Sequence, residues 1–420
     1  MKAYSSQVRC DEVNNMELKL AYDHGWIRMD VPSNVTIDEF RPASVKISQG
    51  ENNLAACLDR EEVRARIAGR SILIVVNDAY RATPTSKILM WLRRWDSTLL
   101  DRASFIVATG AHAAPSPEQL RMIFGELYDR IADRVILHDA RDRSSMTRLG
   151  RDSLGGNVCV NTAVLRHESV IAIGSVEPHY FAGYTGGRKS IFPGLTDIET
   201  IERNHNLANS FDAAPLKCDG NPVAEHLDQL MAMLDPERFT GIQVVSDCRG
   251  GVAGLFVGSL GAAFKDAKHL CDRLYVRNVD SRYETVVCEV LPPLDCSLYQ
   301  AQKSIENCQS AVMDGGKIVV VSACREGIGS DAFHDLALQW DRVANRPKDG
   351  RLRFGSHKLS RIISHARRIA VCIYSTLRED MVSQVFFEPV SDLRYFLTAG
   401  RAEGRIAIVH DAGNTVLRAG

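Results

Sequence analysis

The chain alternates between short, continuous apolar runs and longer stretches of mixed polarity. Apolar runs without internal alternation are typical of strands that are buried on both faces of a parallel sheet. We therefore predict strands at 72–76 (ILIVV), 104–108 (SFIVA), 134–138 (RVILH), 170–174 (VIAIG) and 241–246 (GIQVVS).

Helical stretches are expected between these strands. The pattern predicts helices from Asp59 to Ala68, from Ser86 to about Leu100 and from Val223 to Leu234. Ser116 and Pro117 have the residue types of a helix N-cap and a first helical position. Strands and helices in this order predict a doubly wound α/β sheet, in which ligands bind at the carboxyl ends of the strands.

A second unit of the same kind is expected from about residue 275. Its predicted strands are 283–290, 317–323, 368–374 and 405–410, and its predicted helix is 298–313. The fold class is therefore α/β with two domains, each with a mostly parallel sheet flanked by helices. We place these domains at 1–274 and 275–420, with the boundary near 270–282.

Four stretches depart from the pattern of buried strands and helices. Residues 16–31 alternate between apolar and polar and break at Gly25, which predicts a hairpin or two short strands. We expect a polar surface connection at 32–60, a glycine-rich turn at 250–262 and an exposed basic segment at 351–358.

The composition is that of a soluble globular protein of 420 residues with a net charge of −1. This charge gives no reason to expect nucleic acid or an anionic membrane surface as a partner. No apolar run reaches the roughly 18–20 residues that span a bilayer, and the first residues lack the apolar core of a secretory signal. The eleven cysteines form no C-x-x-C pair, which argues against disulfides or a zinc ribbon and favours a cytoplasmic protein.

The most unusual stretch is 174–206, which follows a predicted strand directly. It contains His179, Lys189 and His205, with Gly183, Gly186 and Gly187 between the first two. Glycines let a backbone approach an anion closely, and two imidazoles with an amine suggest a cofactor site. One histidine can be a base and the other a metal ligand, although no cysteine or carboxylate cluster supports a multi-histidine zinc site.

Lys189 has three readings that the sequence leaves open. It can bind phosphate, it can act covalently through its amine, or it can lie in a charged surface turn. The GYTGGRKS stretch does not meet the P-loop spacing, and no G-x-G-x-x-G follows a predicted strand.

Three further candidate sets lie outside this stretch, and each has a plain structural alternative. Asp78 and Arg81 follow a buried strand and can hold a phosphate, a ribose or a carboxylate, or form a surface ion pair. His112 lies on a loop after the next strand and is a general acid/base candidate or a structural histidine. Gln300 and Lys303 share one helix face and can reach a carboxylate or face solvent.

Together these loops resemble the nickel-pincer lactate racemase family over most of the chain. The most specific segment is EPHYFAGYTGGRKSIFPG followed by ERNH, which looks like the family signature P-H-x-x-A-G-x-x-G-G-x-K-x-x-x-P-G … N-H. DAYRATPT, GAH and QAQKS resemble the family's D-x-x-R-x-T-P, G-x-H and Q-x-x-K motifs, in the same order.

The resemblance implies a cofactor, the nickel-pincer nucleotide (pyridinium-3,5-bisthiocarboxylic acid mononucleotide), attached covalently to Lys189. It implies that His205 is the nickel ligand and that His112 and His179 are the paired acid/base residues. Gly186 and Gly187 would make room for the cofactor, and Asp78 would bind it or order the site. Arg81 would serve both cofactor and substrate, and Gln300 and Lys303 would meet the substrate.

The implied activity is racemisation or epimerisation of a 2-hydroxy acid, either lactate or a larger acid. A hydride would move from C2 of the substrate to the cofactor, leaving a 2-keto acid, and would return to the other face while the histidines carry the hydroxyl proton. Water must be kept out, which favours a cleft between two domains. The implied partners are the substrate and the enzymes that make and insert the cofactor, and a homodimer is left open.

Departures from the family pattern affect the expected substrate. Asn77 stands where an acidic residue is common and Ala113 where arginine is common, so the substrate can differ from lactate. Trp340 is the candidate for the aromatic residue near the pincer. The competing functions are a nicotinamide-dependent 2-hydroxy-acid dehydrogenase, which the missing G-x-G-x-x-G disfavours, and a non-catalytic binding protein, which would not need all four of His112, His179, Lys189 and His205.

Overall fold

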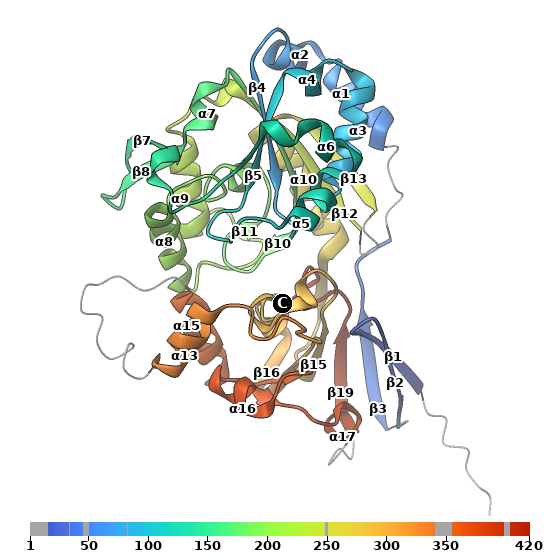
Figure 1. Ribbon diagram of the computed structural model, residues 1–420. Helices are drawn as coiled ribbons and strands as arrows, with labels where there is room; N and C mark the ends of the chain where they lie inside the picture. The colour runs from blue at the N-terminus through green and yellow to red at the C-terminus, as the bar shows by residue number, and fades with distance from the viewer. Residues whose placement is uncertain are drawn as a thin grey trace, which may run out of the picture.

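The computed structural model describes residues 16–32, 34–44, 50–81, 83–247, 251–340, 355–398 and 404–420. Two six-stranded sheets dominate this part of the chain, one above the other in Figure 1. Helices flank both sheets, so the predicted α/β class with parallel sheets is confirmed.

The first sheet has the strand order β13-β12-β9-β4-β5-β6. Its strands are β4 (Ile72–Asn77), β5 (Ala103–Ala108), β6 (Val135–Leu137), β9 (Ser169–Ser175), β12 (Phe239–Ser246) and β13 (Val252–Ser259). All neighbours are parallel except β12 and β13. The five predicted strands are confirmed, because a run buried on both faces must be apolar throughout.

Helices cover both faces of the first sheet and bury two separate apolar clusters. The main ones are α3 (Thr85–Trp95), α5 (Pro117–Phe124), α9 (Pro222–Met231) and α10 (Leu260–Tyr275). Ser116 caps α5 as predicted, because its hydroxyl accepts a hydrogen bond from the Gln119 backbone N–H while the Gln119 side chain accepts one from the Ser116 backbone.

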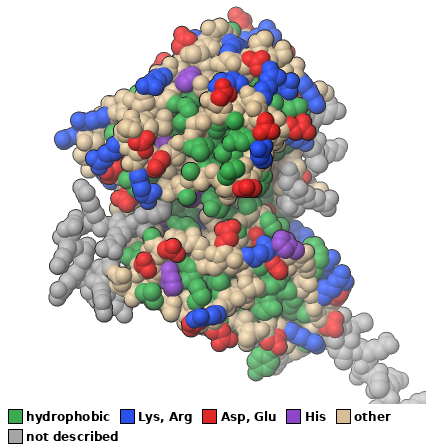
Figure 2. Space-filling model, viewed as in Figure 1, with side chains coloured by type: hydrophobic (Ala, Val, Ile, Leu, Met, Phe, Trp, Pro, Cys, Tyr) green, Lys and Arg blue, Asp and Glu red, His purple; other side chains and the backbone are tan. Residues whose placement is uncertain are grey.

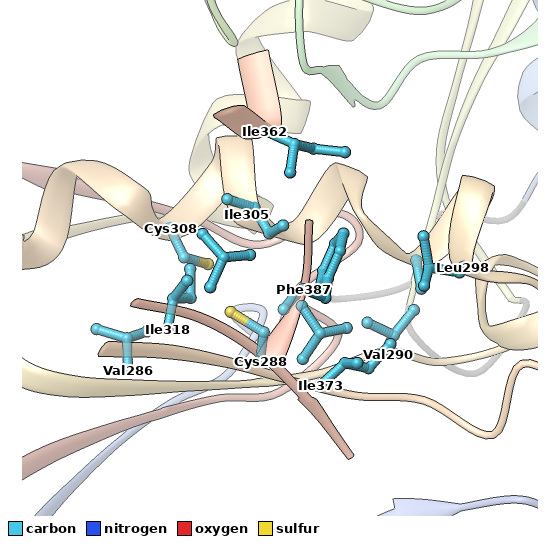
Figure 3. Packing of buried hydrophobic residues seen from close by; sticks show 14 of the residues in the cluster. Val286, Cys288, Val290, Leu298, Ile305, Cys308, Ile318, Ile362, Ile373 and Phe387 are labelled. Atoms are coloured by element: carbon cyan, nitrogen blue, oxygen red, sulfur yellow. The ribbon is translucent and has the colours of Figure 1, made fainter. Parts of the chain in front are cut away.

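The second sheet has the order β18-β17-β16-β15-β19-β3 and is parallel throughout. Its strands are β15 (Tyr283–Glu289), β16 (Val312–Val321), β17 (Ala370–Tyr374), β18 (Glu388–Pro389), β19 (Gly404–Val409) and β3 (Val35–Phe40). Figure 3 shows the cluster beneath its helices, where Cys288 and Cys308 pack among aliphatic side chains. The four strands predicted here are confirmed.

The N-terminal elements join the second sheet rather than the first. The predicted hairpin is present as β1 (Met16–Tyr22) and β2 (Gly25–Val31). Its apolar face packs in one cluster with Val287 and Ile406 of the second sheet. The expectation of a polar surface connection at 32–60 is wrong, because β3 pairs with β19 and α1 (Gly50–Leu58) lies in the same span. The domain boundary at 274/275 stays a prediction. Strand β3 lies before this boundary in the chain but belongs to the second sheet.

The prediction of a glycine-rich turn at 250–262 is also wrong. Residues 251–262 include β13 and the start of α10, whereas 250 lies outside the described residues. Gly254 is explained by close packing, because a Cβ there would lie 2.3 Å from the Leu270 side chain. A Cβ on Gly241 would likewise lie 3.1 Å from the Leu260 Cα, so these glycines let α10 lie close against the sheet.

The helix predicted at 298–313 is divided. It consists of α11 (Leu298–Ala301), α12 (Lys303–Cys308) and a short 3₁₀ turn at Gln309–Ala311, and β16 begins at Val312.

The remaining described helices are α2 (Glu61–Ile67), α4 (Leu99–Arg102), α6 (Tyr128–Ile131), α7 (Thr162–Arg166), α8 (Ile198–Asn206), α13 (Asp331–Leu338), α15 (Ser356–Ala366), α16 (Glu379–Gln384) and α17 (Leu393–Thr398). The smaller sheets pair β7 (Met146–Arg151) with β8 (Asn157–Asn161), β10 (Pro178–His179) with β11 (Gly183–Tyr184), and β14 (Val276–Val279) with β20 (Val416–Ala419).

The basic segment expected to be exposed at 351–358 is buried where the structure describes it. Residues 351–354 lie outside the described part, but Ser356, His357 and Lys358 begin α15 and are buried. The same helix carries Arg361, whose guanidinium donates to the carbonyls of Ala208 and Ala213 in the first half of the chain. Helix α15 therefore connects the two halves next to α8 (Figure 1).

A buried carboxylate, Glu306 on α12, holds α15 in place. It accepts hydrogen bonds from Arg361 at 2.6 and 2.8 Å and lies 2.9 Å from His365 Nε2. Burial alone would raise the pKa of Glu306, but these two partners lower it from 4.5 to about 2. The pair therefore stabilises the fold above pH 4.5 and loses this effect as the pH falls toward 2.

We expect Glu306→Gln to lower the free energy of unfolding by about 3 kcal/mol at pH 7 and by progressively less between pH 4.5 and 2. Denaturant unfolding of both proteins across this range measures the difference. Asp314→Asn is the matched control, because that carboxylate also pairs with an arginine, at 3.0 Å, but its side chain is 75% exposed. The control should change stability by less than about 0.5 kcal/mol. A Glu306→Gln effect that does not depend on pH would contradict the account.

Three further features concern the surface charge, the cysteines and the length of the helices. Lysine and arginine side chains are interspersed with aspartate and glutamate over the face shown in Figure 2. The nine cysteines within the described ranges are all free thiols. No helix in those ranges combines the length and the apolar character needed to cross a bilayer.

Candidate active site

One pocket brings together loops from both halves of the chain. Its upper wall comes from the loops after β9, β4 and β5, which are neighbours in the first sheet. The strand order reverses at β4, so these loops diverge there and leave a crevice, as expected at the carboxyl edge of a doubly wound sheet. Helices α11, α12 and α15 of the second half close the other side, and the space between the walls is about 920 Å³, part of it open to solvent.

Nine of the ten predicted site residues line this pocket. They are Asp78, Arg81, His112, His179, Gly186, Lys189, His205, Gln300 and Lys303. The tenth, Gly187, is not among the lining residues that the structure describes. It has a positive φ of 53°, and a Cβ there would lie 2.6 Å from the Phe264 ring.

Gly186 and Gly187 of the GYTGGRKS turn allow this turn to pack closely against the first sheet and its helix α10. Gly186 has a φ of 73°, and a Cβ there would lie 2.7 Å from Gln243 Oε1 and 2.8 Å from the Ser175 carbonyl oxygen. The Gln243 side chain also accepts a hydrogen bond from the Gly187 N–H. The turn thus lies tightly on the sheet, which fixes the backbone from which Lys189 projects.

His112 and Asp78 form a dyad. The Nδ1 atom of His112 lies 2.6 Å from Oδ2 of Asp78, whose other carboxylate oxygen accepts a hydrogen bond from the Tyr80 N–H. Asp78 is buried, whereas the His112 side chain is 38% exposed. A carboxylate at Nδ1 places the ring proton there and leaves Nε2 with its lone pair, which is the arrangement of a general base.

His179 is held differently. It lies on β10 and is buried, and its Nδ1 accepts hydrogen bonds from the backbone N–H groups of Ala182, at 3.2 Å, and Phe181, at 3.4 Å. Burial and the charge of Lys189 lower the pKa of His179 well below 6.5, so the ring is neutral. Because Nδ1 accepts, the proton of the neutral ring is on Nε2.

Lys189 meets this second nitrogen. Its Nζ lies 3.2 Å from His179 Nε2, and the amine is also 5.4 Å from the centre of the Phe181 ring. Burial, followed by the charges of Arg81 and Lys303, lowers the pKa of the Lys189 amine well below 10.5. The lowered pKa favours the neutral form of the amine, which can accept the His179 Nε2–H and is the nucleophile that a covalent attachment needs.

His205 lies on α8 in an aromatic environment. Its ring centroid is 5.0 Å from that of Phe181 and 5.6 Å from that of His357. Burial lowers the pKa of His205 to about 3, with a contribution from the Lys189 charge and an opposing hydrogen bond to the Ile201 carbonyl. The imidazole is therefore neutral at physiological pH, which is the form that binds a divalent metal.

These residues fit the group that the family resemblance implies. A buried amine with a lowered pKa and a buried neutral imidazole face one pocket, as attachment and single-residue metal ligation require. Within the described ranges, no three His, Cys, Asp or Glu side chains are grouped to hold a metal ion. A metal at His205 would therefore need its other ligands from a bound group.

The cationic residues of the pocket lie close together. Arg81 is 3.9 Å from Glu177, and Lys303 donates to Gln300 Oε1 at 2.5 Å. Burial and the Arg81 charge lower the pKa of Lys303 to about 7, and Glu177 and Asp78 oppose this shift. Two cations and an amide at this position can bind a carboxylate.

Sequence reasoning missed five lining residues that have aromatic or basic side chains. They are Tyr180, Phe181, Tyr299, His357 and Lys358. His357 Nε2 lies 3.2 Å from the Tyr180 hydroxyl. Trp340, the candidate for the aromatic residue near the pincer, packs against the core of the second half instead. The one available signal was the proximity of Tyr180, Phe181 and Tyr299 to family motifs; nothing local marked His357 and Lys358.

Comparison with known proteins covers both halves of the chain. Residues 22–214 match the lactate racemase N-terminal domain, and residues 285–403 match the lactate racemase C-terminal domain. The chain is 32% identical to a lactate racemase of Lactiplantibacillus plantarum over 291 residues, which is 66% of each chain. It is 25% identical to a lactate racemase of Thermoanaerobacterium thermosaccharolyticum over 370 residues, 83% of this chain and 85% of that one.

Solved structures show the same fold. The lactate racemase apoprotein of Thermoanaerobacterium thermosaccharolyticum superposes with a TM-score of 0.82 and 20% identity, covering 96% of this chain and all of that one. A protein from Thermotoga maritima gives a TM-score of 0.69 with 15% identity and covers 90% of this chain and all of that one. The two matched domains, together with these relatives, place the chain in the lactate racemase family.

Proposed function

We propose that this protein racemises or epimerises a 2-hydroxy acid with a nickel-pincer nucleotide attached to Lys189. The observation that carries the proposal is the buried amine of Lys189, 3.2 Å from His179 in a pocket that also contains His112 and His205. Its curated relatives are named lactate racemases, which supports an isomerase acting on this substrate class.

Lys189 and His205 would hold the cofactor. The amine of Lys189, whose pKa is lowered by burial, would form the covalent link, and the neutral imidazole of His205 would ligate the metal. When bound, the nucleotide would accept a hydride from C2 of the substrate and return it. The tight turn at Gly186 would keep the attachment point fixed relative to His179.

His112 and His179 would move the hydroxyl proton. They lie on the loops after β5 and β9, which flank the loop after β4. His112 Nε2 would accept the proton of one enantiomer while Asp78 stabilises the resulting imidazolium. Racemisation needs an acid/base group for each enantiomer, and His179 is the second imidazole in the pocket.

Arg81, Gln300 and Lys303 would bind the substrate carboxylate. Arg81 comes from the first half of the chain and the other two from the second, so the substrate would bridge the halves. We therefore place the active site in a cleft between two domains, where closure excludes water while the 2-keto acid is present. The enzymes that make and insert the nucleotide would be partners of this protein.

The test uses protein co-expressed with the cofactor-making enzymes and a 2-hydroxy acid that carries deuterium at C2. We expect the enantiomer ratio to approach one, a slower rate for the deuterated substrate, and deuterium retained at C2 of both enantiomers. Solvent hydrogen at C2 would indicate proton abstraction and contradict the proposal. Net oxidation that requires added nicotinamide cofactor would support a dehydrogenase instead.

A further inference from the structure

Lys358 is a pocket residue that the proposed function does not use. It lies in the first turn of α15, is only 3% exposed and lines the pocket beside Tyr299. Its Nζ donates to the Tyr299 carbonyl oxygen at 2.7 Å and lies 3.2 Å from the centre of the Tyr299 ring. An ammonium group has three N–H donors, so this carbonyl uses one of them.

Basic side chains outnumber carboxylates in the pocket. Besides the Lys189 amine, Arg81, Lys303 and Lys358 line it, whereas Asp78, which faces His112, is the carboxylate among the described lining residues. Glu177 lies outside this lining, 3.9 Å from Arg81. No ion pair among the described residues includes Lys358. Burial, followed by the charges of Lys303 and Arg81, lowers the pKa of its amine and so disfavours the ammonium form. An anion beside Lys358 would offset this cost, so the pocket favours an anionic occupant there.

One substrate carboxylate does not satisfy this set of cations. In the proposed function, the Lys189 amine is consumed by the covalent link, and the substrate carboxylate binds Arg81 and Lys303. The side chains around Lys358 are then the uncharged ones of Tyr299, Tyr180 and His357. A methyl group such as that of lactate would gain no hydrogen bond there, whereas an anionic oxygen would accept the remaining N–H groups.

We infer that Lys358, placed in the pocket with Arg81 and Lys303, forms a second anion subsite and that the preferred substrate is a 2-hydroxy acid with a second anionic group near C2. This inference rests on the proposed function and adds the substrate class to it. The second group can be a carboxylate or a phosphate, because both present oxygens to an ammonium group.

The experiment compares three probes on the cofactor-loaded protein: malate, 3-phosphoglycerate and 2-hydroxybutyrate, which has an uncharged side chain. We expect kcat/KM for malate or 3-phosphoglycerate, each of which carries a second anionic group, to exceed that for 2-hydroxybutyrate by about 100-fold, and the better of the two identifies the anion. Lys358→Met should lower this ratio about 10- to 100-fold. Lys268→Met is the matched control, because Lys268 also lies over aromatic rings, Tyr184 and Phe264, but outside the pocket.

Binding to the protein without cofactor gives a second readout. The preferred probe with a second anionic group should bind at least about 10-fold more tightly than 2-hydroxybutyrate by calorimetry, and Lys358→Met should remove this preference. A ratio that Lys358→Met leaves unchanged would overturn the inference while racemisation itself remains. Loss of cofactor attachment in Lys358→Met would also overturn the inference, because Lys358 would then bind the nucleotide rather than the substrate. If no probe is racemised by protein that carries the cofactor, the proposed function fails, and the calorimetric preference still tests the subsite.

Discussion

Replacing Lys189 by alanine is expected to lower racemisation by more than about 10⁴-fold, even when the cofactor-making enzymes are present. The physical reason is that the amine is buried beside His179, where burial lowers its pKa and favours the nucleophilic form, and no alanine side chain can form the covalent link. Initial rates of enantiomer interconversion, measured on purified protein, give the comparison with the wild type.

Two other variants make this prediction specific. Lys189→Arg keeps a positive charge but lacks a nucleophilic amine, so it should be as inactive as alanine. Lys303→Met removes a neighbouring lysine of the same pocket, and we expect it to weaken substrate binding while the cofactor still attaches. If Lys189→Arg retained substantial activity, attachment through this residue would not be required.

Asp78→Asn is expected to reduce kcat about 10²- to 10⁴-fold. The carboxylate lies 2.6 Å from His112 Nδ1 and fixes both the tautomer and the charge that the ring can carry. An asparagine amide has no charge to stabilise the imidazolium and can present N–H to Nδ1, which places the ring proton on the wrong nitrogen. Rates must be compared at equal cofactor occupancy.

A double-mutant cycle separates this role from cofactor binding. Once His112 is replaced by glutamine, the Asp78→Asn change should cost little more, because the two residues act as a unit. Additive losses in the double variant would show that Asp78 acts independently of His112. A loss of attached cofactor in Asp78→Asn alone would instead assign the carboxylate to cofactor binding.

The sequence predicts most strands of both sheets, but it predicts less well which strands belong to which sheet. Buried parallel strands are continuous apolar runs, so β4, β5, β9 and β15 are visible locally. Strand β3 (VTIDEF) is not, because its place at the edge of the second sheet depends on pairing with β19, more than 360 residues away in the chain. Gly254 in β13 makes that strand hard to recognise, because this glycine serves close packing against α10, which no local pattern encodes.

The same distinction applies to the site. Residues on loops at strand ends, such as Asp78, His112 and His179, follow from the strand predictions and the motifs. His357 and Lys358 look like an exposed basic segment, because the features that bury them are non-local: Tyr299 accepts from Lys358, and Glu306 holds the helix through Arg361. Burial of a charged stretch can be inferred only when the partners are known.

The central claim is tested most directly by the intact mass and nickel content of protein co-expressed with the cofactor-making enzymes. We predict a single mass increase corresponding to the attached nucleotide, with about one nickel per chain, and the loss of both in Lys189→Ala. Retention of the adduct but loss of nickel in His205→Ala would match the proposed metal ligand. An unmodified, nickel-free wild-type protein under these conditions would contradict the account.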